Sequence, residues 1–238
     1  YDVSDASSTV TVELDISDDG GLTWDVTDTS VTGDVGADIV PGASQTVTWA
    51  AGTDFDGQYE TDMKVRLRAL DTNNNQSDNY NSSNLALDTA DPIISNISPV
   101  QTLGSTDVVI TYDLSDNNTD NILVALDISE DGGSNWIVTD TSVTGDVGSA
   151  VTAGVGNTIT WDAGTDFDAE AQSDMRVRLR ATDKYTNQGN IVSSSNFAVD
   201  TEDATVSNVA AVQTGASNNV VIAYDLTDAS STDLIVEL

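Results

Sequence analysis

The 238-residue chain contains no cysteine and no histidine, and its lysines and arginines together number only seven. Without cysteine or histidine it cannot build a Ser-His-Asp triad, a thiolate nucleophile or an ordinary zinc or copper site. It also cannot form disulfides, so packing and bound ions must supply its stability. Carboxylate chemistry is the enzyme chemistry that remains.

Long apolar runs are also absent. No stretch of about 18 apolar residues occurs, and the first residues lack the basic and then apolar layout of a signal peptide. Acids dominate instead: 40 Asp and Glu residues give a formal charge of -33, and all but six of them are Asp. A surface of this charge repels nucleic acid and anionic membranes, so we expect neither as a partner of this segment.

An internal repeat organises the chain. "YDVSD", "YDLSD" and "YDLTD" begin at Tyr1, Tyr112 and Tyr224, and residues 15–111 align with 127–223 without a gap, with 54 identities in 97 positions. We therefore expect two periods plus an overlap, cut from a longer tandem array. The predicted domains are a partial repeat at 1–88 that lacks strand A and most of strand B, a complete repeat at 89–200, and the start of a third repeat at 201–238 with strands A to C.

Within the complete repeat, alternation and turn residues predict seven short strands and no helix of useful length. They are Ile93–Ile97 (A), Val108–Leu114 (B), Ile122–Ile128 (C), Trp136–Asp140 (C'), Thr158–Trp161 (E), Met175–Ala181 (F) and Ile191–Val199 (G). About seven strands in about 110 residues predict two sheets packed face to face. The fold class is therefore all-β, with tandem sandwiches of the immunoglobulin-like or fibronectin III-like kind.

Strand F carries six of the seven bases, in "MKVRLRA" and "MRVRLRA", on the face opposite its apolar residues. The neighbouring strand C is expected to present Glu13, Asp15 and Asp127 outward. Cross-strand charge pairs are the favoured interpretation, and a face that binds an anionic ligand is the alternative.

A repeated acidic loop, "DISDDGGLTW" at 15–24 and "DISEDGGSNW" at 127–136, fits S-x-D-x-G-x-T-W in its first copy. It resembles the Asp-box of sialidases and other propellers, in which the box is a hairpin turn away from the active site. One box in 112 residues is too sparse for propeller blades. We expect a structural hairpin, with Asp19 bonding its own loop and Trp24 anchoring a strand in the core, and an adventitious cation site as the alternative. Trp49, Trp136 and Trp161 are likewise expected in the core.

The wider pattern "YDLSD…LDISEDGGSNW…TSVTGDVGSAVTAGVGNTITWDAGTDFD…MRVRLRATD" resembles the immunoglobulin-like or fibronectin III-like repeats of large prokaryotic surface and secreted proteins. It covers nearly the whole period. The resemblance implies the sandwich fold and an extracellular or cell-surface location, but no single activity.

Sandwich topology predicts where the aspartates gather. The linker "LDTADP" follows strand G of one repeat, and the B–C and F–G loops of the next repeat face it, so Asp88 and Asp91 should converge with Asp116 and Asp183. Calcium takes six to eight oxygens from such ligands, and Asn118 and Asn187 add to the supply. The resemblance adds that cadherins and bacterial adhesin arrays hold calcium at such junctions.

By the repeat, the further candidate ligands are Asp200, Asp203 and Asp228 at the second junction, and Asp5 and Asp71 toward a preceding linker. The alternative is that these aspartates cap turns and solvate loops.

The predicted function is a structural repeat segment of an extracellular filament, adhesin stalk or cell-surface fibre, rigidified by calcium at inter-domain junctions. Its partners are neighbouring repeats, head to tail, and lateral copies that meet at exposed edge strands. No catalytic or organic cofactor-binding residue is predicted. Most of the acids recur in turns and linkers of both copies, and active sites are seldom duplicated in every repeat. A carbohydrate-binding or spacer module of a large secreted enzyme is the alternative, with Tyr59, Tyr80 and Tyr185 as candidate exposed aromatics.

Overall fold

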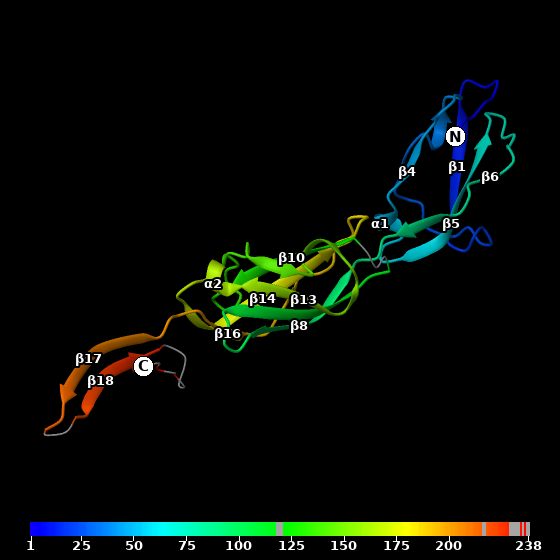
Figure 1. Cartoon of the computed structure of the whole chain (residues 1–238). Coiled ribbons are helices and arrows are strands. Elements are labelled where there is room, and N and C mark those ends of the chain that lie inside the picture. The colour runs from blue at the N-terminus through cyan, green and yellow to red at the C-terminus, as the bar shows by residue number, and fades with distance from the viewer. Residues whose placement is uncertain (118–120, 216–217, 229–233, 235, 237–238) are drawn as a thin grey trace. The chain divides into compact units, whose positions relative to one another are not determined.

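The computed structural model describes residues 1–117, 121–215, 218–228, 234 and 236, and their strands pair in antiparallel sheets (Figure 1). This architecture is consistent with two β-sandwich domains. The described residues form two compact units. The first comprises Tyr1–Asp91 with short segments that begin at Asp116 and Tyr185, and the second comprises the remainder.

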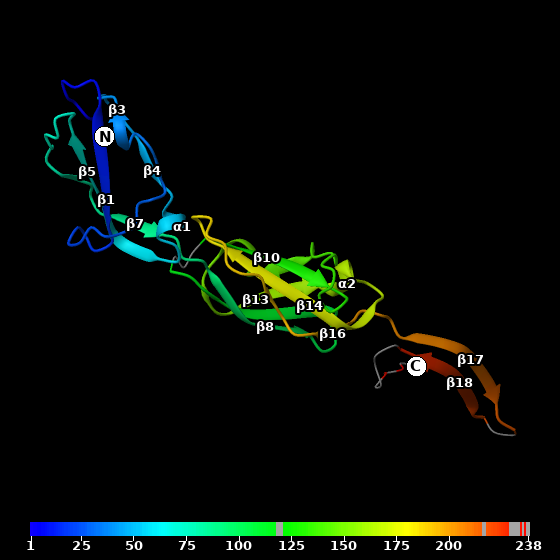
Figure 2. The ribbon, with the colours of Figure 1, turned by 180° about the vertical axis from the view of Figure 1, so that it is seen from behind.

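The second unit contains two sheets, which Figures 1 and 2 show from opposite sides. One has the order β11-β13-β9-β8, and the other has the order β12-β10-β14-β15 with β16 also paired to β14. The strands are β8 (Ile93–Gln101), β9 (Asp107–Ser115), β10 (Ile122–Ser129), β11 (Val143–Gly145), β12 (Gly148–Val151), β13 (Gly154–Asp162), β14 (Ala171–Thr182), β15 (Val192–Ser193) and β16 (Phe197–Asp200). A four-residue helix, α2 (Ala163–Asp166), joins β13 to the segment before β14.

Alternate residues of these strands form one hydrophobic core. On β9, Val108 and Ile110 are fully buried and Tyr112 is nearly so, whereas Thr111 between them is exposed. Trp161 on β13 is fully buried. The two-residue alternation of the sequence thus places one face of each strand inward.

The first unit repeats much of this plan with β1 (Val10–Ser17), β2 (Val31–Gly33), β3 (Gly36–Ile39), β4 (Val47–Trp49), β5 (Tyr59–Leu70), β6 (Tyr80–Asn81), β7 (Leu85–Asp88) and helix α1 (Ala51–Asp54). One sheet has the order β3-β1-β5-β6 with β7 on β5, and β2 pairs with β4. Among the described residues β4 pairs with β2 alone, whereas β13, its counterpart, has a neighbour on each edge. Val65 and Leu67 on β5 are only partly buried.

β17 (Thr205–Gln213) and β18 (Val220–Thr227) form a two-stranded antiparallel sheet. Their pairing of Val206 with Leu226 repeats the pairing of Ile94 with Leu114, 112 residues earlier. The strand C expected for a third repeat falls mostly outside the described residues.

Strands A, B, C, E and F overlap the strands observed, and two expectations need correction. Trp136–Asp140 is not a strand: Val138 makes an isolated bridge to Ile128, and the chain then turns away, because Asp166 accepts hydrogen bonds from Thr141 and Ser142. Strand G is divided into β15 and β16, which pair with different parts of β14.

The outer face of the β1–β5 and β10–β14 pairs carries the expected charge pairs. Asp15 contacts Arg66 and Asp127 contacts Arg178, each at 2.8 Å between Nε and a carboxylate oxygen, and Glu13 pairs with Arg68. This confirms the interpretation that bases on strand F form cross-strand charge pairs with acids on the neighbouring strand C.

Of the four tryptophans expected in the core, Trp161 is fully buried and Trp49 is only partly buried, whereas Trp24 and Trp136 lie elsewhere. Trp24 and Trp136 are half-buried, and the guanidinium carbons of Arg66 and Arg178 lie 4.4 and 4.5 Å from their ring centroids. A guanidinium over an indole face is favourable, so packing against these two arginines stabilises the rings on the outer face of the sheet.

Candidate metal centre

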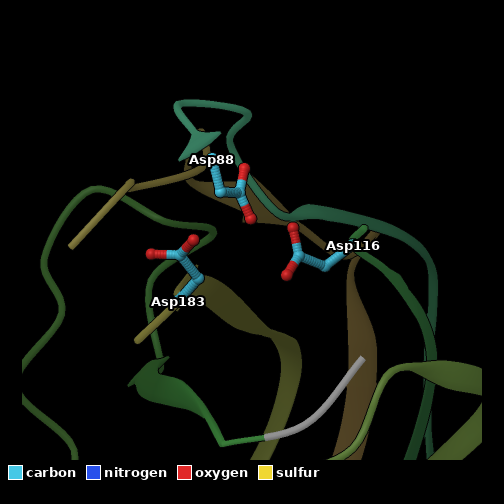
Figure 3. A group of neighbouring side chains, drawn as sticks. All are labelled: Asp88, Asp116 and Asp183. Carbon is cyan, nitrogen blue, oxygen red and sulfur yellow. The ribbon is translucent and has the colours of Figure 1, made fainter. Parts of the chain in front are cut away.

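Three of the predicted aspartates lie together (Figure 3). Asp88 is the last residue of β7, Asp116 directly follows β9, and Asp183 directly follows β14. One carboxylate oxygen from each lies within 4.8 Å of the other two. Asp88 and Asp183 are 6% and 5% exposed, and Asp116 is partly buried. The cluster is therefore a compact group of carboxyl groups largely withdrawn from solvent.

Thr89 fixes the chain immediately after Asp88. Its hydroxyl donates to the Phe55 carbonyl at 2.5 Å, and its N–H donates to the Gln58 carbonyl at 2.8 Å. Thr201 makes the equivalent bonds to Phe167 and Glu170. Because Thr89 is 5% exposed and bonded on both its backbone and its side chain, the position of Asp88 is set by the end of β7 rather than by a loose linker.

Asp88 is further held by its own turn and by Asn187. Its Oδ1 accepts from the Ala90 N–H at 3.0 Å, and its backbone carbonyl accepts from Asn187 Nδ2 at 3.2 Å. Asn187 therefore directs its amide nitrogen, not its oxygen, at Asp88. The other amide considered as a ligand, Asn118, lies outside the described residues.

This cluster could hold a metal ion. Calcium binds oxygen at about 2.3–2.6 Å, so two of its ligands can be up to about 5 Å apart. Oxygens within 4.8 Å of one another meet that limit. Three carboxylates close together also repel one another, and a divalent cation relieves this repulsion.

The other predicted ligands are not part of this group. Asp91 is exposed and lies outside it. Asp200 and Asp203 occupy the equivalent linker positions, and Asp200 Oδ1 accepts from the Glu202 N–H as Asp88 does from Ala90. Asp228 corresponds to Asp116 and is partly buried. Among the described residues these three form no such group with a third carboxylate oxygen.

Asp5 and Asp71 bond to their own loops. Asp5 Oδ1 accepts from the Ser7 N–H at 2.7 Å. Asp71 accepts from Asn75 through both side chain and backbone and from the Asn73 N–H, and these bonds lower the pKa of Asp71. This is the turn-capping role weighed against calcium.

The Asp-box loops are turns of the same kind. Asp19 accepts from the N–H groups of Thr23 and Leu22 and from the Thr23 and Ser17 hydroxyls, which lowers its pKa to about 2. Asp131 accepts from Asn135 and Ser129 and also has its pKa lowered to about 2. Gly20 and Gly21 adopt positive φ, as expected. The expected turn, with its Asp bonded to its own loop, is present in both copies, whereas Trp24 does not anchor a strand in the core.

Sequence reasoning missed one repeated carboxylate. Asp54 Oδ2 accepts from the Ser30 N–H and from Trp49 Nε1, and Asp166 makes the equivalent bonds. Desolvation raises the pKa of Asp54, but the hydrogen bonds from Ser30, Thr29 and Trp49 outweigh it and lower the pKa. The identical "AGTDFD" in both copies was the available signal.

Comparison with protein families, curated proteins and solved structures yields no match for this chain. Within the part of the chain that the structure describes, no helix has the length and apolar character needed to cross a membrane.

Proposed function

We propose that this chain is a structural repeat segment of an extracellular filament, adhesin stalk or cell-surface fibre, built from immunoglobulin-like or fibronectin III-like sandwiches and stiffened by calcium. The observation that carries the proposal is the convergence of the Asp88, Asp116 and Asp183 carboxylates, which are far apart in sequence.

Calcium is the cation that this ligand set favours. All three side chains offer hard, anionic oxygen, and the chain contains no histidine or cysteine to recruit a softer metal. Magnesium prefers shorter bonds and near-ideal octahedral geometry, whereas calcium accepts irregular geometry, so three carboxylates from separate segments suit calcium better.

Stiffening follows from where the ligands lie along the chain. Asp88 is the last residue of β7, whereas Asp116 and Asp183 belong to loops of the following repeat. An ion bound by all three restrains rotation about the backbone of residues 89–91. Each repeat that carries the same set then adds one restrained joint, which is the property that a stalk requires.

A carbohydrate-binding or spacer module of a secreted enzyme is the second candidate. Tyr80 and Tyr185 are 70% and 50% exposed, and exposed aromatic rings are the usual platform for sugars. Oligosaccharide titrations followed by tyrosine and tryptophan fluorescence test it: saturable quenching that Tyr80→Ala or Tyr185→Ala removes supports this candidate over the structural role.

Calcium depletion and restoration test the main proposal. The chain is stripped with EDTA, and its melting temperature and small-angle scattering are followed as calcium is restored. We expect calcium to raise the melting temperature and to narrow the distribution of particle lengths, and expect Asp88→Asn or Asp183→Asn to remove both effects.

Asp91→Asn is the matched control, because it removes the same charge from the same linker outside the cluster. Sodium chloride at equal ionic strength controls for screening. An equal response to sodium, or an equal loss in the Asp91→Asn variant, contradicts a specific site.

A further inference from the structure

The loop between β14 and β15, residues 183–191, meets the linker that joins β7 to β8. Asn187 Nδ2 donates to the Asp88 carbonyl at 3.2 Å, and two residues further along the loop Gly189 lies against the Pro92 carbonyl. The loop carries one carboxylate of the candidate metal centre, and Asp88 carries another. The spacing between the loop and the linker therefore sets how closely these two carboxylates approach each other.

Position 189 has no room for a side chain in this arrangement. A β-carbon built on Gly189 would overlap the Pro92 carbonyl oxygen and would stand 3.2 Å from the Pro92 carbonyl carbon, whereas ordinary contact begins at about 3.4 Å. Both opposing atoms belong to the backbone, and both residues are buried, so nothing here can swing aside as a flexible side chain would. Glycine at such a point allows two segments of backbone to approach closely.

The conformation of Gly189 does not itself require glycine, because its φ lies outside the left-handed region. The Gly189 N–H donates to the Ala181 carbonyl at 3.0 Å. Ser77, its counterpart 112 residues earlier, donates in the same way to the Ala69 carbonyl at 2.9 Å. Serine is thus compatible with the base of this loop, and the closeness of Pro92 is the reason why glycine is needed at position 189.

We propose that Gly189 is a positioning residue that sets the calcium affinity of the Asp88, Asp116 and Asp183 centre; this inference rests on the proposed calcium site. With glycine at position 189 the loop packs on the linker, and the three carboxylates lie within reach of one ion. A side chain at this position forces the loop and the linker apart. Calcium then loses a ligand or binds at longer distances, and its affinity falls.

The same position predicts a difference between repeats. Serine stands at position 77 where glycine stands at position 189, so the two loops differ at the point that meets the linker in the complete repeat. A junction formed against a loop with serine here should bind calcium more weakly than a junction formed against a loop with glycine. This single position of the repeat therefore sets which joints of an array are stiff at a given calcium concentration.

Calorimetric titration of the EDTA-stripped full chain with calcium gives the first test. Gly189→Ser introduces the residue of the other copy, and Gly189→Ala adds the β-carbon alone. We expect both to raise the dissociation constant for calcium by about 10–100-fold, the loss typical when a group that orients a metal ligand is changed. Gly52→Ser is the matched control, because a β-carbon at Gly52 meets no atom within 4 Å, and it should leave the affinity unchanged.

Two measurements in EDTA separate positioning from general damage to the fold. The melting temperature of the Gly189→Ser chain should stay close to that of the unsubstituted chain, because the base of the loop accepts serine. Amide hydrogen exchange of residues 183–191 should become faster, because the loop no longer packs against Pro92. A large fall in the melting temperature, or lost calcium affinity with unchanged exchange, would overturn the positioning role.

The outcomes distinguish the role of Gly189 from the calcium site itself. Absence of calcium binding by the unsubstituted chain contradicts both. Binding that Asp183→Asn abolishes, but that Gly189→Ser and Gly189→Ala retain at full affinity, leaves the calcium site in place and overturns the role of Gly189. Weakened binding in both glycine variants, with the Gly52→Ser control unchanged, supports the proposal.

Discussion

Residues 15–91 and residues 127–203 have closely similar sequences but bury the same residue types to different extents. Trp161 is fully buried, whereas its counterpart Trp49 is partly exposed, although Asp166 and Asp54 accept hydrogen bonds from the two indoles in the same way. β9 pairs with β13 beside Trp161, whereas among the described residues β2 is the one strand that pairs with β4, the strand that carries Trp49. Burial of this tryptophan therefore accompanies the pairing of a second strand along its own strand.

A second difference concerns one aspartate in equivalent loops. The Asp71 carboxylate accepts hydrogen bonds from the N–H groups of its own loop, whereas Asp183 lies with Asp88 and Asp116. Asp71 is thus seen bonded within its loop, and its counterpart Asp183 is seen in the candidate metal centre.

The largest expected effect distinguishes the two tryptophans. Trp161→Ala should destabilise the second unit by about 3–5 kcal/mol, as truncation of a fully buried aromatic does. Trp49→Ala should cost the first unit roughly half as much, because less apolar area leaves water when Trp49 packs. Calorimetric unfolding of the full chain measures both, and equal costs would contradict the difference in burial.

A smaller effect separates the two tyrosines. Tyr112→Phe removes a buried hydroxyl that donates to the Asp146 carbonyl at 2.5 Å and should cost about 1 kcal/mol. Tyr1→Phe should cost less, since Tyr1 is 36% exposed and water can replace its bond. Urea denaturation of the two variants checks this order, and a larger loss for Tyr1→Phe would reverse it.

Much of this architecture could be predicted from sequence. Alternation located most strands, and the spacing of Arg66 and Asp15 on neighbouring strands indicated their pairing. The meeting of Asp88, Asp116 and Asp183 was predicted from topology, because the linker after one repeat was expected to face the B–C and F–G loops of the next.

Three other features of the site and the core are visible in the structure but could not be predicted from the sequence. Asp91 follows the anchored Thr89 by two residues and extends into solvent, which the linker sequence does not indicate. The outward position of Trp24 depends on where the guanidinium of Arg66 lies. The bonds of Asp54 to Ser30 and Trp49 join segments whose meeting has no periodic signal.

Acid should act on the shared Asp-box turns of both regions. The folded-state pKa of Asp19 and of Asp131 is about 2, below the usual value of 3.8. A depressed folded-state pKa contributes stability that is fully present above the unfolded pKa and is lost as the pH falls from about 4 to about 2. Asp131→Asn should therefore lower the melting temperature at pH 6 and lose most of this effect near pH 2. A difference that is constant with pH would contradict the role of ionised Asp131.

The smallest expected effect lies on the outer face. Arg178→Lys keeps the charge but loses the planar group over Trp136, and it should cost about 0.2–1 kcal/mol. The equivalent Arg66→Lys should cost a similar amount, because Trp24 and Asp15 surround Arg66 in the same way. Thermal denaturation of the pair measures both, and a loss several times larger in one copy would show that the two faces are not equivalent.

Calorimetric titration of the EDTA-stripped chain with calcium tests the central claim most directly. The account predicts a saturable site that Asp183→Asn abolishes and Asp91→Asn retains. Absence of binding, or the same binding in both variants, would show that the convergence of Asp88, Asp116 and Asp183 does not form a calcium site.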